Sequence, residues 1–282
     1  MNTAKIREKI AFAVLGFATL LTVAPILLTI LYIVKNGASG INWSFIAEAP
    51  RNGMKEGGIL PAIIGTIVLI IGTMVFSLPL GILSAVYLVE YAKDNAFTRL
   101  IKLSVVNLSG IPSIIYGLFG FTLFVMFLKL GTSILAGSMT LAIMSLPVII
   151  TATKEALEAV PASFREISLS LGATKWQTTR YCVLPYAVPG ILTGTVLSLS
   201  RAAGETAPIL FTVAAFYLPR LPRSVFDQVM ALPYHLYVIS TQVPNMPMRI
   251  SFATALVLIV LVFLMNLISI VLRAHYRKKK QW

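Results

Sequence analysis

Residues 161–185, PASFREISLSLGATKWQTTRYCVLP, form a charged, Gly-punctuated segment between two apolar runs that are each long enough to cross a membrane. A bare loop would be enough to connect two such runs. Pro161 suits the first position of a helix, where its missing N–H costs nothing. Gly172 suits the left-handed position just after a helix ends. The segment therefore predicts about three turns of helix between these two residues, placed where a soluble partner could bind.

The apolar positions of this predicted helix form one narrow ridge. The residues spaced to share that face are Phe164, Ile167 (or Ser168) and Leu171. An apolar ridge facing water suits docking in a groove of another protein. Packing against the membrane surface is equally compatible with the periodicity, because amphipathic interfacial helices are common.

The composition assigns the rest of the chain to a membrane. Of 282 residues, 57% are hydrophobic and only 12% are charged, against about a quarter charged in soluble domains. The net charge of +13 does not indicate nucleic acid, because the Lys and Arg lie almost entirely between the apolar runs, as orientation in a bilayer requires. The single Cys182 and the lack of metal-ligand spacing argue against a redox role, a metal site or a bound cofactor.

Six apolar segments are long enough to cross a bilayer as helices. They are 10–34, 61–89, 103–128, 133–152, 185–214 and 252–273. Barrel strands would show an alternating polarity that is absent. The first segment follows MNTAKIREK and is too long for a signal-peptide core, so we interpret it as an uncleaved span. The sequence thus predicts an all-α membrane protein with six transmembrane helices.

The distribution of Lys and Arg predicts the orientation. With the N-terminus inside, fifteen of the 23 fall in inner segments and seven in outer segments. This excess predicts both termini in the cytoplasm. The outer segments 35–60 and 215–251 are long, and the second contains ALPYHLYVIS. That stretch fits either an interfacial or re-entrant helix or a solvated loop.

Polar residues interrupt two of the spans. Arg201 and Glu205 are four residues apart, so they share a helix face and can pair. An intramembrane Arg tends to face the protein interior or a watery path. The pair is either a neutral structural contact or a cation that eases the passage of an anion. In the third span, the hydroxyls of Ser113 and Tyr116 could bind phosphate or sulfate, although such residues also serve close helix packing.

The spacing around Gly172 resembles a known motif. The segment resembles the EAA loop of ABC importer permeases. It has Glu166 with the two residues after it, then three residues, Gly172, nine residues, and finally Cys182 followed by one residue and Leu-Pro. That loop reads Glu-Ala-Ala, three residues, Gly, nine residues, Ile, any residue, Leu-Pro. This chain departs at the two positions after Glu166 and at Cys182.

The resemblance implies a type I ABC importer permease fold with a cytoplasmic coupling helix seated on a separate ATPase. It implies that the coupling residues are Arg165, Glu166, Leu171, Gly172, Ala173, Lys175 and Trp176. The sequence itself contains no G-x-x-x-x-G-K-[ST] phosphate-binding loop. ATP would therefore be bound by the partner subunit, and the chain would not be an enzyme.

Three further stretches, GIPSIIYGLFG, RAAGETAP and ALPYHLYVIS, are similar to phosphate importer permeases of the PstA type. The likeness covers the chain from about residue 60 onward. It implies transport of inorganic phosphate across a bacterial or archaeal inner membrane, beside a PstC-type permease, a PstB-type ATPase dimer and an extracytoplasmic PstS-type phosphate-binding protein. The expected substrate path contains Arg201, Glu205, Ser113 and Tyr116.

These expectations divide the chain into three parts. Residues 1–58 hold the first helix and a periplasmic loop, 59–273 the transmembrane domain with its coupling loop at 154–185, and 274–282 a basic tail. Electrostatics alone does not separate phosphate from sulfate or molybdate. A gradient-driven secondary carrier is a further alternative, which would need ion sites near mid-membrane. An intramembrane enzyme would need a Ser/His or paired-carboxylate set, which the spans lack.

Overall fold

The computed structural model describes residues 3–278, which fold almost entirely into helices. The long helices are α1 (Thr3–Gly37), α3 (Leu60–Val86), α6 (Ile134–Glu158), α9 (Leu184–Gly204) and α12 (Met248–Lys278). The shorter helices are α2 (Trp43–Ala47), α4 (Ala96–Ser109), α5 (Ser113–Gly120), α7 (Ala162–Ser170), α8 (Lys175–Gln177), α10 (Ala207–Leu210) and α11 (Leu232–Thr241). The remaining elements are the 3-10 turns η1 (Ala38–Gly40) and η2 (Asn52–Met54), the π turns η3 (Tyr87–Tyr91), η4 (Phe121–Phe127) and η5 (Thr178–Val183), and the antiparallel strands β1 (Pro50–Arg51) and β2 (Glu56–Gly57).

Within residues 3–278, five helical stretches are long and apolar enough to cross a membrane, and a bent pair adds a sixth if its two parts form one span. The bent pair is α4 with α5 and η4, whose axes differ by 108°. The third span expected over 103–128 is therefore bent, at residues 110–112, rather than one continuous helix. Pro112 has no N–H to donate to the carbonyl of Leu108. The Tyr116 hydroxyl donates to that carbonyl instead, at 2.6 Å, so the break is satisfied within the chain.

Close contacts fix the direction of each helix. Gly72 lies against Ser138 and Gly81 against Ile149, so α3 and α6 run in parallel. The segment between two parallel spans must return across the membrane, which makes the bent pair a broken span. A Cβ on Gly81 would come within 2.6 Å of the Ile149 side chain, so the helices approach closely because this residue is small.

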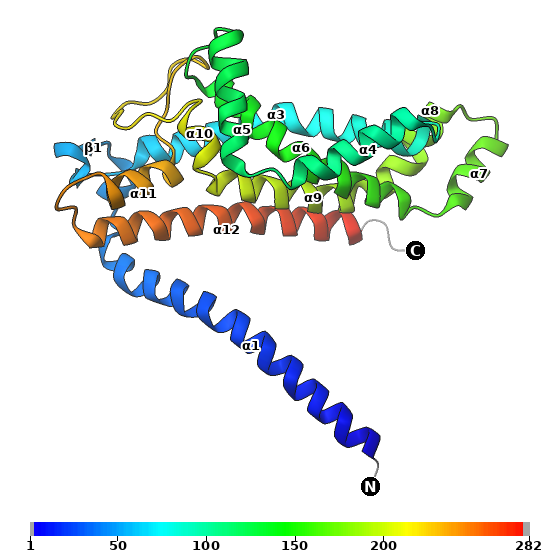
Figure 1. Ribbon diagram of the computed structural model, residues 1–282, viewed down its shortest axis with the longest axis horizontal. Helices are drawn as coiled ribbons and strands as arrows, with labels where there is room; N and C mark the ends of the chain where they lie inside the picture. The colour runs from blue at the N-terminus through cyan, green and yellow to red at the C-terminus, as the bar shows by residue number, and fades with distance from the viewer. Residues whose placement is uncertain (1–2, 279–282) are drawn as a thin grey trace.

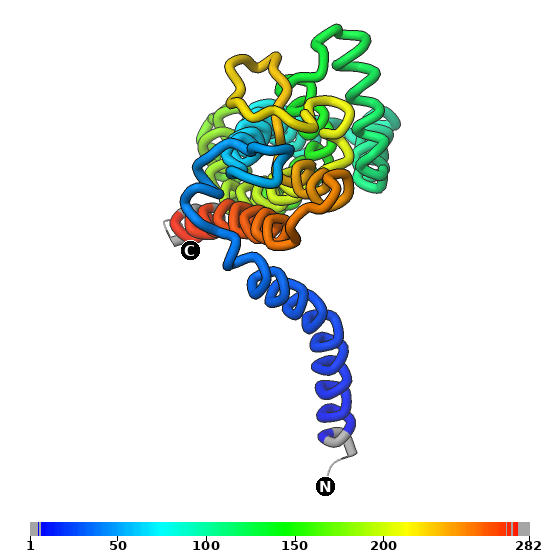
Figure 2. Tube along the Cα trace, turned by 90° about the vertical axis from the view of Figure 1, so that its left-hand side faces the viewer, coloured from blue at the N-terminus to red at the C-terminus, as the bar shows by residue number. Residues whose placement is uncertain are grey.

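Helices α9, α12 and α1 complete the arrangement. A Cβ on Gly194 of α9 would meet Ala152 of α6, and the Ser198 hydroxyl of α9 lies 3.4 Å from the Ser145 carbonyl, so α9 runs antiparallel to α6. Helix α12 lies beside α9, and α1 leans away from the bundle (Figures 1 and 2). The chain thus makes six crossings, and both ends of its described part point toward the end of the bundle that carries α7 (Figure 1).

The outer segment 215–251 contains a buried helix, α11, rather than a solvated loop. The backbone N–H of Leu232 donates to the Thr66 hydroxyl of α3 at 2.8 Å, which fixes the start of α11 on the bundle. Leu232, Val238 and Ile239 are buried against α3, α12 and the outer loops. The loop before α11 is also anchored, because the N–H of Ile134 donates to the Asp227 carbonyl at 2.9 Å.

Two helix boundaries in the structure differ from those expected from the sequence. The fifth span, expected to reach residue 214, ends at Gly204, and α10 follows as a separate turn. Glycine has a low helix propensity, and Pro208 has no N–H to donate to the Gly204 carbonyl. Together these two residues explain why α9 ends at Gly204. The expected basic tail 274–282 continues α12 as far as Lys278, and its last four residues lie outside the described chain.

Candidate functional site

Helix α7 forms the exposed end of the bundle between α6 and α9 (Figure 1). It spans Ala162–Ser170, one residue shorter at each end than the interval between Pro161 and Leu171. Pro161 occupies the N-cap position rather than the first helical position. Gly172 has φ +83°, so the predicted left-handed residue after the helix is confirmed. The turn is closed by the N–H of Gly172, which donates to the Leu169 carbonyl at 2.9 Å.

The apolar ridge predicted for α7 is divided between two sides of the helix. Ser168 is buried, and its hydroxyl lies 2.9 Å from that of Thr178 in η5. The ring of Phe164 packs edge-on against Tyr186 of α9, with 4.9 Å between centroids. These two contacts seat the inner side of α7 on the start of the fifth span.

The outer side of α7 and the turn after it form what we call the coupling surface. It consists of three exposed apolar residues, Ile167, Leu171 and Trp176. Leu171 is 83% exposed and Ile167 is 61% exposed. A hollow of about 310 Å³ adjoins them, lined by Phe164, Ile167, Ser168, Leu171, Ala173 and Cys182. Large exposed apolar side chains around a hollow, on a segment that also carries charged residues, are typical of a protein-docking site.

Arg165 points inward, away from this surface. Its guanidinium donates to the Glu90 carboxylate at the end of the second span, with an Nη2–Oε1 distance of 2.7 Å. It also donates to the carbonyls of Leu157 and Val160, at 2.9 Å each. The Arg165 and Glu90 side chains are 22% and 11% exposed. A guanidinium held by one carboxylate and two carbonyls fixes α7 relative to the ends of α3 and α6.

The other residues expected to couple lie on or next to the coupling surface. Glu166 is exposed on α7, and Lys175 begins α8. Thr174 caps α8 through a reciprocal pair of hydrogen bonds with Gln177. The N–H of half-buried Ala173 donates to the Ser168 carbonyl at 3.2 Å. The cap and the turn therefore hold Trp176 in a defined position on α8, just after the Gly172 turn.

The second candidate site is the predicted pair Arg201–Glu205, which the structure confirms. The Arg201 Nε lies 3.2 Å from Glu205 Oε1. Arg201 is in the last turn of α9, whereas Glu205 is the extended residue just after the helix. Glu205 borders a small cavity whose other lining residues belong to α3, α6, α9, α10 and the outer segment, among them Thr66 and Pro233. Its side chain is 17% exposed, against 50% for Arg201.

Arg201 belongs to a stripe of α9 that no other part of the described chain covers. Thr193 and Leu197 precede it at four-residue spacing and are also exposed. The opposite face of α9 is buried against α3 and α6. Arg201 therefore projects from the bundle on the side of the fifth span that the described chain leaves uncovered.

The two hydroxyl residues of the expected path have different environments. Tyr116 is buried and near enough to Arg201 to interact with its charge, but its hydroxyl hydrogen is engaged by the Leu108 carbonyl. In this conformation Tyr116 cannot also donate to an anion. Ser113 is the first residue of α5 and half-buried. The structure thus places Tyr116 within range of the Arg201 charge and gives it a structural hydrogen bond.

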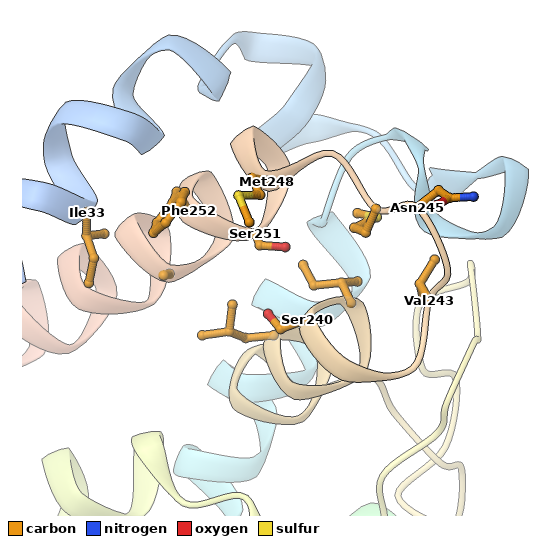
Figure 3. A pocket seen from close by; sticks show the side chains of 11 residues that line it. Ile33, Ser240, Val243, Asn245, Met248, Ser251 and Phe252 are labelled. Atoms are coloured by element: carbon orange, nitrogen blue, oxygen red, sulfur yellow. The ribbon is translucent and has the colours of Figure 1, made fainter.

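A larger hollow of about 500 Å³ lies at the outer end, between α1, α11 and the start of α12 (Figure 3). Ile33, Met248 and Phe252 form one of its walls (Figure 3). None of the eleven described residues that line it is charged. This lining suits apolar atoms, so the hollow is no candidate for binding an inorganic anion. Within residues 3–278, no group of three His, Cys, Asp or Glu could hold a metal ion.

Sequence reasoning did not find Glu90. Its only local signal is that it is an acidic residue at the end of an apolar run, three residues before Lys93. Its partner lies 75 residues away in the sequence. Local spacing could not indicate such a pair.

A bundle of membrane-length helices, with a short exposed amphipathic helix at one end and a charged pair at the end of the fifth span, fits the membrane subunit of a transporter. Residues 77–281 match the family described as binding-protein-dependent transport system inner membrane component, and the chain belongs to this family. It is thus an ABC importer permease of the type I fold, a multi-pass protein of the inner membrane.

Individual relatives agree with this assignment. A probable ABC transporter permease protein, YqgI of Bacillus subtilis strain 168, is 32% identical over 250 residues, which cover 84% of this chain and 85% of that protein. The phosphate transport system permease protein PstA of Mycobacterium leprae is 33% identical over 274 residues, 95% of this chain and 89% of the relative. A bacterial ABC transporter involved in import of the acidic polysaccharide alginate has a similar fold, with a TM-score of 0.67 and 16% identity over 96% of this chain and 99% of that one.

Proposed function

We propose that this permease forms half of the membrane path of an ATP-driven importer of inorganic phosphate. The observation that carries the proposal is the Arg201–Glu205 pair, a cation held at the end of the fifth span on an uncovered helix face. The similarity to PstA of Mycobacterium leprae supports phosphate as the anion. The alginate transporter shares only the fold at 16% identity, so it does not bear on the substrate.

Arg201 requires a partner beside α9. An Arg exposed to lipid near the membrane centre costs at least about 3 kcal/mol on insertion scales. Half of the Arg201 side chain is exposed in the isolated chain. A second permease subunit of the PstC type would cover this stripe and form a polar path with it. Phosphate in that path would meet Arg201, while Glu205 holds the guanidinium in place until the anion arrives.

The coupling surface would receive the force for transport. The exposed side chains of Ile167 and Leu171 suit a groove on an ATPase of the PstB type. ATP would be bound and hydrolysed there, since the chain has no phosphate-binding loop of its own. The excess of Lys and Arg in segments on this side supports a cytoplasmic location for α7 and both termini. A phosphate-binding protein would then dock at the opposite end, on the outer segment 215–251.

The test is transport by the reconstituted complex. The chain is purified from membranes with whichever ATPase and second permease accompany it, and labelled phosphate uptake is measured in vesicles with ATP, with sulfate and molybdate as competitors. Arg201→Gln is expected to cut uptake while the complex still assembles. Arg99→Gln, at an exposed position of α4, is the matched control.

Three results would contradict parts of the proposal. Preferential competition by sulfate or molybdate would assign another oxyanion. Uptake that persists without any ATP-hydrolysing partner would indicate a gradient-driven carrier. Unchanged uptake by Arg201→Gln would remove this residue from the path.

A further inference from the structure

The Glu90–Arg165 pair differs from the other ion pairs among the described residues, which join residues three or four positions apart. Lys154–Glu158 and Arg201–Glu205 each join residues four positions apart. Glu90 and Arg165 are 75 residues apart and join the second span to α7. A contact within one helical turn moves with its helix, whereas a contact between two elements can pass a displacement from one to the other.

The pair is also partly buried and held by several hydrogen bonds. Arg165 Nε lies 3.1 Å and 3.3 Å from the two Glu90 oxygens, and Nη2 lies 2.7 Å from Oε1. The remaining donors reach the carbonyls of Leu157 and Val160 at the end of α6. Paired, partly buried charges with several hydrogen bonds hold one geometry, because separating them leaves a desolvated charge without a partner.

The local backbone places Glu90 for this contact. Glu90 lies in the π turn η3, where the N–H of Ala92 donates to the carbonyl five residues earlier, Tyr87, at 2.8 Å. The wider turn changes the direction of the residues after Val86 relative to a continuous α-helix. A hollow of about 200 Å³ borders Glu90, Arg165 and Leu169. The end of α3 therefore meets α7 through this ion pair beside an open space.

We propose that the Glu90–Arg165 pair is the positioning link that passes movement of α7 to the second span. Arg165 then acts in coupling from inside the chain, and the ATPase contacts are made by the coupling surface on the other side of α7. This inference rests on the proposed function, because it needs a partner that moves α7. It assigns a role to Glu90. It also changes the role expected for Arg165, from a contact with the ATPase to a link that transmits the movement of α7.

The experiment measures phosphate transported per ATP hydrolysed by the reconstituted complex. Glu90→Gln and Arg165→Met are expected to keep the ATPase bound and active, while the ratio falls roughly tenfold. The charge swap Glu90→Arg with Arg165→Glu is expected to restore part of the ratio, since it rebuilds the ion pair but loses the bonds to Leu157 and Val160. Lys154→Met is the matched control, because it breaks a pair within α6 at the same end of the bundle.

Several outcomes would overturn the link. One is a normal ratio of phosphate transported to ATP hydrolysed in both single variants. Another is a charge-swapped double variant whose ratio is no higher than that of either single variant. Loss of ATPase binding in Arg165→Met alone, with Glu90→Gln unaffected, would show direct contact between Arg165 and the ATPase. If Arg165→Met does not accumulate, Glu90→Asp decides, because it keeps the charge and shortens the reach; an unchanged ratio there overturns the link. A wild-type complex that transports no phosphate would instead contradict the proposed function.

Discussion

Replacing Gly172 by Val tests whether the geometry of the turn after α7 matters for coupling. Gly172 has φ +83°, a conformation that residues with a Cβ rarely adopt. A Cβ added there would meet nothing within 4 Å. The cost of the substitution is therefore a backbone cost, free of clashes with neighbouring residues.

The size of the effect follows from this backbone cost. A left-handed conformation costs an L-residue roughly 1–2 kcal/mol, and every 1.4 kcal/mol is about tenfold in an equilibrium constant. Gly172→Val should thus lower the equilibrium constant for the native conformation of the turn by roughly five- to thirty-fold. Leu171 and Trp176, on either side of the turn, would lose their fixed spacing. Gly172→Asn should be milder, because Asn tolerates this conformation.

The assay is the ratio of phosphate taken up to ATP hydrolysed in vesicles that contain the whole complex. The expected result for Gly172→Val is a lower ratio with ATP hydrolysis retained. Gly131→Val is the matched control, since Gly131 has φ +66° with open space around it but precedes α6 at the opposite end of the bundle. A normal ratio in Gly172→Val, or an equal loss in Gly131→Val, would refute the reasoning.

Two further predictions address the docking surface and the outer helix. Leu171→Ser should weaken co-purification of the ATPase while the permease pair still assembles, because the most exposed apolar side chain beside α7 is lost; undiminished recovery of the ATPase would exclude this contact. His235 of α11 is 2% exposed, and burial lowers its pKa to about 4. The unfolded chain, with a His pKa of about 6.5, binds more protons between these values, so stability should fall by up to about 3 kcal/mol as the pH drops from about 6.5 to 4. Thermal unfolding should show a smaller loss in His235→Leu, and an identical pH profile would contradict the assignment.

The sequence alone predicted what depends on local order. Apolar runs of membrane length must become helices, because lipid offers no partner for backbone polar groups. Helix α7 stops just before Gly172, because glycine adopts the left-handed conformation that residues with a Cβ resist. The Arg201–Glu205 pair could be predicted because four-residue spacing brings side chains together without help from the rest of the fold.

Tertiary structure alone decided which surfaces meet. Periodicity left Ile167 and Ser168 as alternatives on α7, and only packing against the fifth span turned Ser168 inward and left Ile167 exposed. Glu90 and Arg165 meet because three spans converge at one end of the bundle. A pattern in sequence reports the period of a helix, but the partner of each face is chosen only when helices distant in sequence pack together.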